Sequence, residues 1–261
     1  MEQNKTHYRP RVKFTKKMKK EYTILCPMMA PIHASIILPV FAKEGLNVKI
    51  IESGGAEAIE KGLKYVHNDL CYPGVLVTGQ MINAVESGKF DPDKIAMVIT
   101  QSGGGCRDSN YINLMRKSME RAGYPQIPFI SANIWGMELN SGIDISIRGY
   151  RMLLSALMYG DMMMIAANQV RPYEVNKGDA DRMMQKWTAY FGERYTKGKG
   201  YSHKEIKKNI RTMLQEFADI EVKKVPKVKV AVVGELYLKY SAPANNDLEQ
   251  FLRDQDCETY F

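Results

Sequence analysis

The feature that most limits the possible folds is an apolar run followed by a glycine-rich turn and a helical pattern. Ile95–Thr100 (IAMVIT) predicts a buried strand because it is a short, continuous apolar run. Gln101–Asn110 (QSGGGCRDSN) holds three consecutive glycines and Cys106, and Tyr111–Ala122 has apolar residues at helical spacing. We therefore expect Cys106 on a turn between a strand and the N-terminus of a helix.

The same alternation of strand and helix recurs along the first half of the chain. The other expected strands are Glu21–Leu25, Asn47–Ile51 and Pro128–Ser131, and the other expected helices are Pro31–Glu44, Glu57–Val66 and Val75–Glu86. A strand–helix–strand order of this kind is typical of parallel strands joined by crossover helices. The sequence thus predicts an α/β fold with a parallel sheet of the Rossmann or flavodoxin type.

The chain divides into four expected parts. Residues 1–20 form a basic arm, 21–140 the α/β domain, 141–222 a helical section, and 223–261 the start of a second α/β unit. The helical section is rich in methionine, which at helical spacing favours a packing face over a cofactor site. The last part offers one strand, Lys227–Val233, and one helix, Asn245–Arg253. Since two elements cannot offset the entropy of ordering a sheet, this part either docks on the first sheet or belongs to a longer protein, and we favour a chain cut short.

Composition limits the function class only moderately. A hydrophobic content of 45% and a charged content of 25% are ordinary for a globular protein. Much of the net charge of +8 lies in the first twenty residues, which predicts a solvated arm, and nothing resembles an aromatic platform or zinc-finger spacing for nucleic acid. No stretch resembles a signal peptide or a membrane span, so we expect a cytoplasmic protein. Four cysteines then favour metal or redox roles over disulfides.

Three of the cysteines occupy equivalent positions. Cys26 and Cys106 each follow an expected strand and precede a helix, and Cys71 stands where a helix begins. Because the carboxyl ends of parallel strands meet at one edge of a sheet, these thiols are expected to converge. Helix N-termini favour thiolates, and three converging thiolates suit an iron–sulfur cluster. Residues that would lie around the cluster or the substrate are Gln101, Ser102, Arg107 and Asn110, although helix capping explains Ser102 and Asn110 equally well.

Other interpretations stay open at this point. Cys106 alone is explained equally well as an inert buried thiol in a tight turn. A zinc site would need a fourth ligand, for which His33 and His67 are the candidates. Cys106 could also act as a nucleophile with either histidine as base and the glycine turn as an oxyanion hole. That interpretation leaves Cys26 and Cys71 unexplained, and Cys257 is expected outside any of these sites.

Several short motifs resemble the 2-hydroxyacyl-CoA dehydratase family (D component). They are closest to the dehydratase-like part of acyl-CoA dehydratase activase-related proteins. The motifs are Cys26-Pro27, the run Asn68, Asp69, Cys71, Tyr72, Pro73, Gly79 and Gln80, the run Gly103–Arg107 with Ser109–Tyr111, and the later Val233–Tyr237 and Ala244–Asn246. The resemblance covers most of the chain from about Tyr22 onward, and the combination of motifs is more specific than any one of them.

The resemblance implies a cofactor and a reaction. Family members hold a [4Fe–4S] cluster through three cysteines and leave one iron open, and by motif those ligands would be Cys26, Cys71 and Cys106. A partner activator hydrolyses ATP and passes one electron to the cluster, and the dehydratase then removes water from a 2-hydroxyacyl-CoA through a ketyl radical. Related members carry double-cubane clusters and reduce other small substrates. An oligomer is also expected.

One departure from the family pattern leaves a second function open. The glycine runs of this chain do not form a P-loop, so the chain has no visible ATP-binding module of its own. An iron–sulfur subunit that transfers electrons without a substrate of its own is therefore the alternative to a dehydratase or reductase component.

Overall fold

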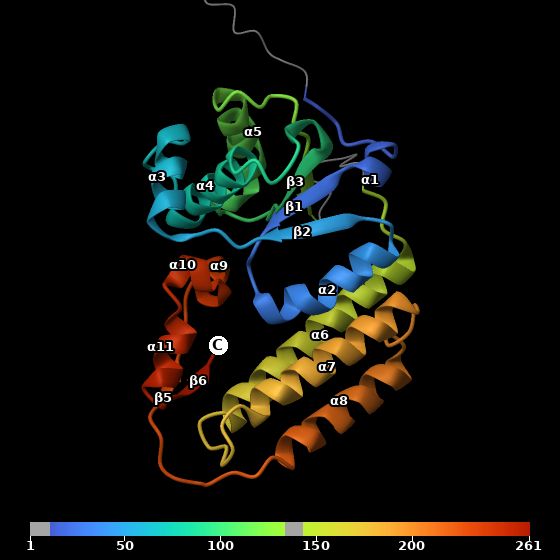
Figure 1. Ribbon diagram of the computed structural model, residues 1–261, viewed down its shortest axis with the longest axis vertical. Helices are drawn as coiled ribbons and strands as arrows, with labels where there is room; N and C mark the ends of the chain where they lie inside the picture. The colour runs from blue at the N-terminus through green and yellow to red at the C-terminus, as the bar shows by residue number, and fades with distance from the viewer. Residues whose placement is uncertain (1–10, 134–142) are drawn as a thin grey trace, which may run out of the picture.

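A four-stranded parallel sheet organises the N-terminal half of the chain (Figure 1). A computed structural model describes residues 11–133 and 143–261. The strands are β1 (Thr23–Pro27), β2 (Asn47–Ile51), β3 (Ile95–Thr100) and β4 (Phe129–Ala132), in the order β2-β1-β3-β4, and each neighbouring pair is parallel. The predicted α/β fold with a parallel sheet is confirmed.

Helices lie between these strands as the alternation predicts. They are α2 (Pro31–Lys43) after β1, α3 (Gly55–Tyr65) and α4 (Tyr72–Glu86) after β2, and α5 (Tyr111–Arg121) after β3, with short 3₁₀ helices η1 (Pro92–Lys94) and η2 (Arg107–Asn110). The chain goes from β1 to one side of the sheet to form β2, and then returns past β1 to form β3. The strand order therefore reverses between β1 and β3.

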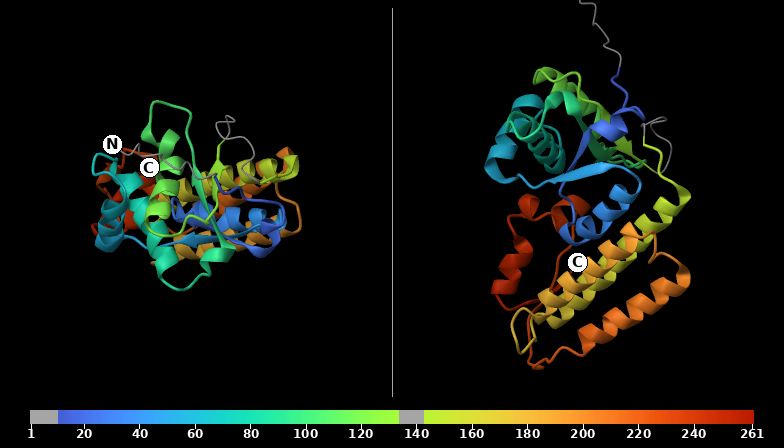
Figure 2. Two further views of the ribbon diagram at one scale, coloured as in Figure 1. Left: turned by 90° about the horizontal axis from the view of Figure 1, so that it is seen from above. Right: turned by 45° about the vertical axis from the view of Figure 1, so that its right-hand side comes forward.

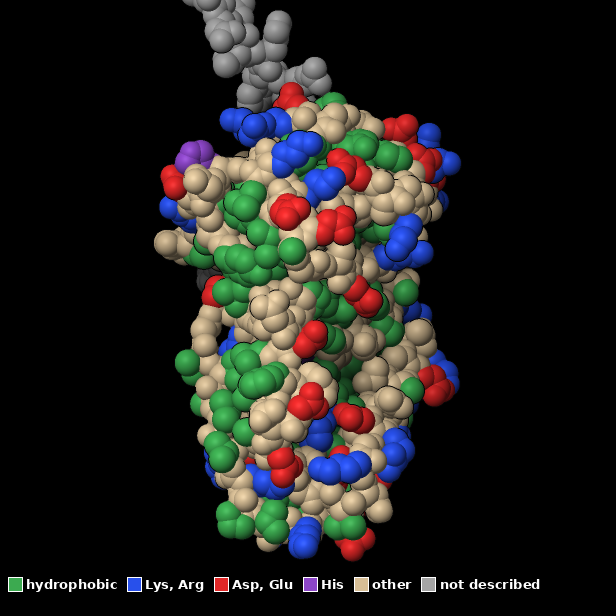
Figure 3. Space-filling model, turned by 60° about the vertical axis from the view of Figure 1, so that its left-hand side comes forward, with side chains coloured by type: hydrophobic (Ala, Val, Ile, Leu, Met, Phe, Trp, Pro, Cys, Tyr) green, Lys and Arg blue, Asp and Glu red, His purple; other side chains and the backbone are tan. Residues whose placement is uncertain are grey.

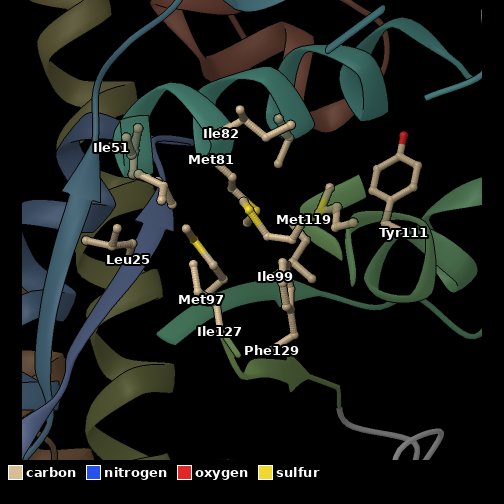
Figure 4. Close-up of a cluster of buried hydrophobic side chains, with 14 of the residues drawn as sticks. Leu25, Ile51, Met81, Ile82, Met97, Ile99, Tyr111, Met119, Ile127 and Phe129 are labelled. Atoms are coloured by element: carbon tan, nitrogen blue, oxygen red, sulfur yellow. The ribbon is translucent and has the colours of Figure 1, made fainter. Parts of the chain in front are cut away.

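Alternating side chains of the strands fill two separate cores. On one face, Leu25, Met97 and Phe129 pack with residues of α4 and α5, as Figure 4 shows for Met81, Ile82 and Met119. On the other face, Ile24, Ala96 and Ile130 form a smaller cluster with Phe14 and Leu46. Burial on both faces explains why the strands are continuous apolar runs rather than alternating ones.

Part of the predicted basic arm packs on the sheet. Residues 1–10 lie outside the described residues, but Phe14 is only 3% exposed and Met18 packs against the same cluster. A short helix α1 (Met18–Glu21) connects this segment to β1. The expected boundary between the α/β domain and the helical section, at residues 140–141, also lies outside the described residues.

The helical section contains three long helices and uses α2 as a fourth. They are α6 (Ile147–Val170), α7 (Asp179–Thr196) and α8 (His203–Ala218). Their core includes the fully buried Met152 and Met163, as expected for a methionine packing face, and a stacked pair of rings, Tyr159 and Phe191, with centroids 3.9 Å apart. Ile36 and Val40 of α2 belong to this core as well. Within the described residues no helix is both long and apolar enough to cross a bilayer.

The C-terminal segment forms a small unit with its own two-stranded parallel sheet. Strand β5 (Lys229–Ala231) is shorter than predicted, and it pairs with β6 (Glu258–Tyr260), which the sequence did not indicate. Three short helices lie between them: α9 (Leu236–Tyr240), α10 (Ala242–Asn245) and α11 (Leu248–Asp254). In Figures 1 and 2 this unit (red) lies beside α2, next to the sheet.

Specific contacts dock this unit on the first sheet. The Tyr237 hydroxyl donates to Gln80 Oε1 at 2.7 Å, and the Ser241 hydroxyl donates to the Met28 carbonyl at 2.9 Å. Gly54 lies so close to Pro243 that a Cβ at Gly54 would be 2.3 Å from the proline Cβ. The docking is therefore made to α4 and to the loops that leave the carboxyl ends of β1 and β2.

The close packing of α3 on α4 depends on glycine and gives a test of the fold. A Cβ at Gly79 would lie 1.7 Å from the Ala58 carbonyl oxygen, so the two backbones must separate to admit one. We expect Gly79→Ala to lower the free energy of unfolding by about 1–3 kcal/mol. In the control Gly192→Ala the nearest atom, Pro39 Cγ, is 3.5 Å away. That variant should be neutral or slightly more stable, since alanine favours a helix. Urea unfolding of both variants checks this, and equal effects would contradict it.

Candidate functional site

The three cysteines singled out in the sequence all lie at the carboxyl side of the sheet, where the strand order reverses. Cys26 is the fourth residue of β1 and pairs in register with Ile50. Cys106 follows β3 and precedes η2, and Cys71 is the residue immediately before α4. In open α/β sheets ligands bind outside the carboxyl ends of the strands at such a reversal point.

A buried tyrosine connects two of the cysteines. The Tyr111 hydroxyl lies 2.6 Å from Cys71 Sγ, joining the first residue of α5 to the start of α4. Burial raises the pKa of Tyr111 well above its usual range, and the hydrogen bond to Cys71 adds to the shift. Negative charge on Cys71 and on Cys106 would raise the pKa of Tyr111 further. The phenol therefore stays protonated, and it lies within the electrostatic reach of both sulfurs.

Hydrogen bonds fix the turn that carries Cys106. The Asp108 N–H donates to Cys106 Sγ at 3.5 Å, and the Ser102 N–H donates to the Asp108 carboxylate at 2.7 Å. Arg107 donates to the carbonyl of Asp69, which ties this turn to the loop before Cys71. Cys106 itself is exposed, and a Cβ on Gly104 would meet no atom within 4 Å. The turn is therefore fixed by hydrogen bonds at Ser102, Arg107 and Asp108, and it is open to solvent at Gly104 and Cys106.

Cys26 sits in a different environment. Burial raises the pKa of its thiol to about 12, and Sγ is 3.6 Å from the Pro27 carbonyl. Tyr237 of α9 lies within electrostatic reach of Cys26. Burial is the chief cause that raises the pKa of Tyr237 to about 12, and negative charge on Cys26 adds to the shift. Negative charge on Tyr72, the neighbour of Cys71, would also raise the pKa of Tyr237. The docked C-terminal unit therefore covers the Cys26 side of the site.

The four residues expected around the cysteines have distinct roles. Gln101 is buried, donates to the Ser109 carbonyl at 2.7 Å, and accepts from the Ser131 hydroxyl at 2.6 Å, so it supports the turn. Asn110 precedes α5 but makes no side-chain cap; its amide oxygen accepts from Asn113 instead. Arg107 connects the two cysteine loops as described above.

Ser102 differs from the other three. Its hydroxyl is buried and has no hydrogen-bond partner among the described residues, so it does not cap a helix. A buried hydroxyl without a partner costs free energy, and such a group calls for an explanation such as a bound ligand.

The two histidines are engaged elsewhere. His33 Nε2 lies 2.9 Å from the Asp161 carboxylate, between α2 and α6. His67 is exposed and lies beside Asp69, 3.2 Å from its carboxylate. Among the hydrogen bonds of the described residues, none joins either imidazole to a cysteine. Cys257 lies in the C-terminal unit, where it lines a cavity with Arg171 and Asp256 rather than the sheet edge.

The groups around the cysteines indicate the charge of a ligand that this edge could hold. In the described part of the chain, no three His, Cys, Asp or Glu side chains lie close enough to share one metal ion. An N–H donor on Cys106, an O–H donor on Cys71 and the N-terminus of the 15-residue helix α4 suit a negatively charged cluster.

Sequence reasoning missed three polar side chains of this region: Tyr111, Gln80 and Tyr237. All three lie within the motifs of the resemblance, but nothing in their spacing shows that Tyr111 reaches Cys71 or that Tyr237 bonds Gln80. Those pairs join residues 40 and 157 positions apart, respectively, and only the tertiary structure reveals them.

No protein-family model, curated protein or solved structure matches this chain. The geometry of the sheet edge and the sequence motifs are therefore the basis on which a function can be proposed.

The contrast between the thiols predicts their reactivity. At pH 8 in the metal-free, reduced protein, iodoacetamide should label exposed Cys106 quickly. Cys26 should react roughly a thousandfold more slowly than a free thiol, since burial raises its pKa to about 12 and so makes the thiolate rare. Its labelling should rise with pH, because only the thiolate reacts. Peptide mass spectrometry measures each rate, and urea-unfolded protein is the control. Equal native rates for Cys26 and Cys106 would contradict the assignment.

Proposed function

We propose that this chain is an iron–sulfur protein of the 2-hydroxyacyl-CoA dehydratase type, acting in the cytoplasm with an ATP-dependent activator. The observation that supports the proposal is that Cys26 lies at the end of β1, Cys106 follows the neighbouring strand β3, and Cys71 is bonded to Tyr111 at the start of the helix after Cys106. The three cysteines would hold a [4Fe–4S] cluster, which when bound supplies one-electron transfer and an open iron able to polarise a thioester or hydroxyl oxygen. The substrate would be an acyl-CoA or a related compound.

The protein groups around the cysteines would stabilise negative charge on the sulfurs. The Asp108 N–H and the Tyr111 O–H donate to the sulfurs of Cys106 and Cys71 and stabilise negative charge there. The N-terminus of α4 adds a positive dipole end at Cys71. Cys26 must lose its proton on binding, and its burial makes that step costly unless iron compensates.

The open side of the site is at the glycine turn. Gly104 and Gly105 have free space around them, and Cys106 is exposed, so a substrate would approach from this side. The unpartnered Ser102 hydroxyl lies on the same turn and would donate to a bound oxygen. The activator is expected to be the electron source, because this chain carries no P-loop.

Cluster content is the first test. Anaerobic reconstitution should give a brown protein with about four iron and four sulfide per chain. Cys26→Ser, Cys71→Ser and Cys106→Ser should each lose most of the iron, because each removes one of three protein ligands. Cys257→Ser is the matched control and should keep it, since Cys257 lies in the C-terminal unit.

The opposite outcomes are equally informative. A colourless wild-type protein without iron or sulfide would refute the proposal. Iron loss in the Cys257→Ser variant alone would place any metal elsewhere. Hydrolytic activity that depends on Cys106 in an iron-free protein would favour the nucleophile interpretation.

Substrate binding separates a dehydratase or reductase component from an electron-transfer subunit. If the open iron meets a substrate, a 2-hydroxyacyl-CoA should change the EPR spectrum of the reduced cluster. Coenzyme A without the acyl group is the control and should change it less. An unchanged spectrum over a panel of acyl-CoA compounds would favour the subunit that only transfers electrons.

Tyr111 offers a test of the electrostatic arrangement. Tyr111→Phe removes the donor to Cys71 Sγ but keeps the buried ring. We expect full cluster loading and a lower reduction potential, since hydrogen bonds to cluster sulfurs favour the reduced, more negative state. Tyr190→Phe, on α7, is the control. An unchanged potential in the Tyr111 variant, measured by EPR-monitored titration, would show that the phenol has no such role.

A further inference from the structure

A groove with an apolar floor lies on the surface between α6 and α8, within the helical section. Its volume is about 860 Å³, and its floor is formed by Met158 of α6 with Ile206, Ile210 and Leu214 of α8. Met158 is 48% exposed and Leu214 is 38% exposed. These side chains belong to long, well-packed helices, so the groove is a formed feature of the fold.

The apolar surface continues along α6. Ile147, Leu154, Met158 and Ile165 follow one another at helical spacing on the same face, and Leu154 is 63% exposed. Single exposed apolar side chains are normal, but a stripe along a 24-residue helix is not. An amphipathic helix laid along such a groove would bury anchors at successive turns.

The walls of the groove are basic. Lys207 and Arg211 line it one helical turn apart, and Lys204 and Lys208 are exposed on the same helix. Arg151 of α6 extends toward the start of α8, with its guanidinium 5.4 Å from the centre of the Tyr201 ring. None of the described lining residues carries a carboxylate. The surface of α8 that borders the groove therefore has one sign of charge.

Carboxylates of the two helices are already paired on their inner sides. Glu205 bonds Arg194 and the Ser202 hydroxyl, Glu216 bonds Lys186 and the Trp187 indole, and Asp161 bonds His33. Within the described residues, Lys207 and Arg211 have no such partner. Another face, shown in Figure 3, carries basic and acidic side chains intermixed. The charge bias of the groove is thus local.

We propose that this groove binds an amphipathic helix of another protein, with aliphatic side chains on one face and Asp or Glu on its flanks. The floor would take the aliphatic anchors, and the unpaired Lys207 and Arg211 would meet the carboxylates. A second copy of this chain is a poor occupant, because two basic walls would face each other. Nucleic acid would leave the apolar floor unused. The proposal does not depend on the iron–sulfur site.

Fluorescence anisotropy with designed peptides tests the proposal on the full chain, with or without iron. The probe is a fluorescein-labelled helical peptide as long as α8, with Leu at i, i+3, i+4 and i+7 and Glu on both flanks. A second peptide has Lys in place of each Glu. Wild-type protein should bind the Glu peptide at least roughly tenfold more tightly than the Lys peptide.

Variants locate the binding surface. Lys207→Glu with Arg211→Glu should weaken the Glu peptide roughly tenfold or more and favour the Lys peptide, because the charge of the wall is reversed. Leu214→Ser should weaken both peptides by removing a floor contact, and circular dichroism checks that it folds. Lys89→Glu with Lys94→Glu reverses two exposed charges near the sheet, far from the groove, and is the control that should bind like wild type.

Several results would overturn the proposal. They are equal binding by the charge-reversed variant and wild type, no binding of the Glu peptide by wild type at millimolar concentration, and dimerisation that depends on Leu214. Binding of duplex DNA or phosphatidylserine vesicles through Lys207 and Arg211, with no binding of the Glu peptide, would assign the surface to a different partner.

Discussion

The parallel pairing of β1 with β2 on one side and β3 on the other decides where the chemistry of this protein can lie. Because the strand order reverses at β1, the loops that leave β1 and β3 diverge to opposite faces of the sheet and leave room between them. Cys26 and Cys106 sit on those two strand ends. Cys71 lies near the Cys106 turn because Arg107 bonds the Asp69 carbonyl and Tyr111 bonds Cys71. No local motif could achieve this with the cysteines so far apart in sequence.

Helix α2 makes the sheet and the helical section one structure. Ile36 and Val40 pack with the long helices, while Phe41 packs with the cluster on the sheet. The C-terminal unit adds a second connection, because Tyr237 and Ser241 bond the sheet domain and Glu258 of β6 accepts from the Tyr173 hydroxyl of the helical section. The groove of α6 and α8 lies at the outer side of this arrangement, away from the cysteines.

The sequence predicted the elements of the first half well, because buried parallel strands are apolar runs and the turns between them hold glycine and proline. The sequence was less informative where contacts between distant residues determine whether a segment packs, pairs or bonds. Phe14 looked like part of a charged arm, yet its ring is buried in the cluster on the sheet and Met18 packs beside it. Strand β6 has only three residues, and it is a strand because it pairs with β5. The bond between Tyr111 and Cys71 could not be read from spacing either.

The energetic question at the site is whether a half-buried thiol such as Cys26, whose pKa is strongly raised, suits a metal ligand. Raising its pKa from 9.0 to about 12 adds about 4 kcal/mol to the cost of forming the thiolate. Structural zinc sites gain about 10–16 kcal/mol on binding their metal, which shows that bonds between thiolates and a metal can offset a cost of this size. Without iron the neutral thiol is the stable form, which protects Cys26 from alkylation and oxidation. The exposed Cys106, with an N–H already directed at its sulfur, has the opposite character. Exposure therefore separates the two thiols: Cys106 is open to reagents and ligands at the turn, whereas Cys26 would bind a metal only by giving up a strongly held proton.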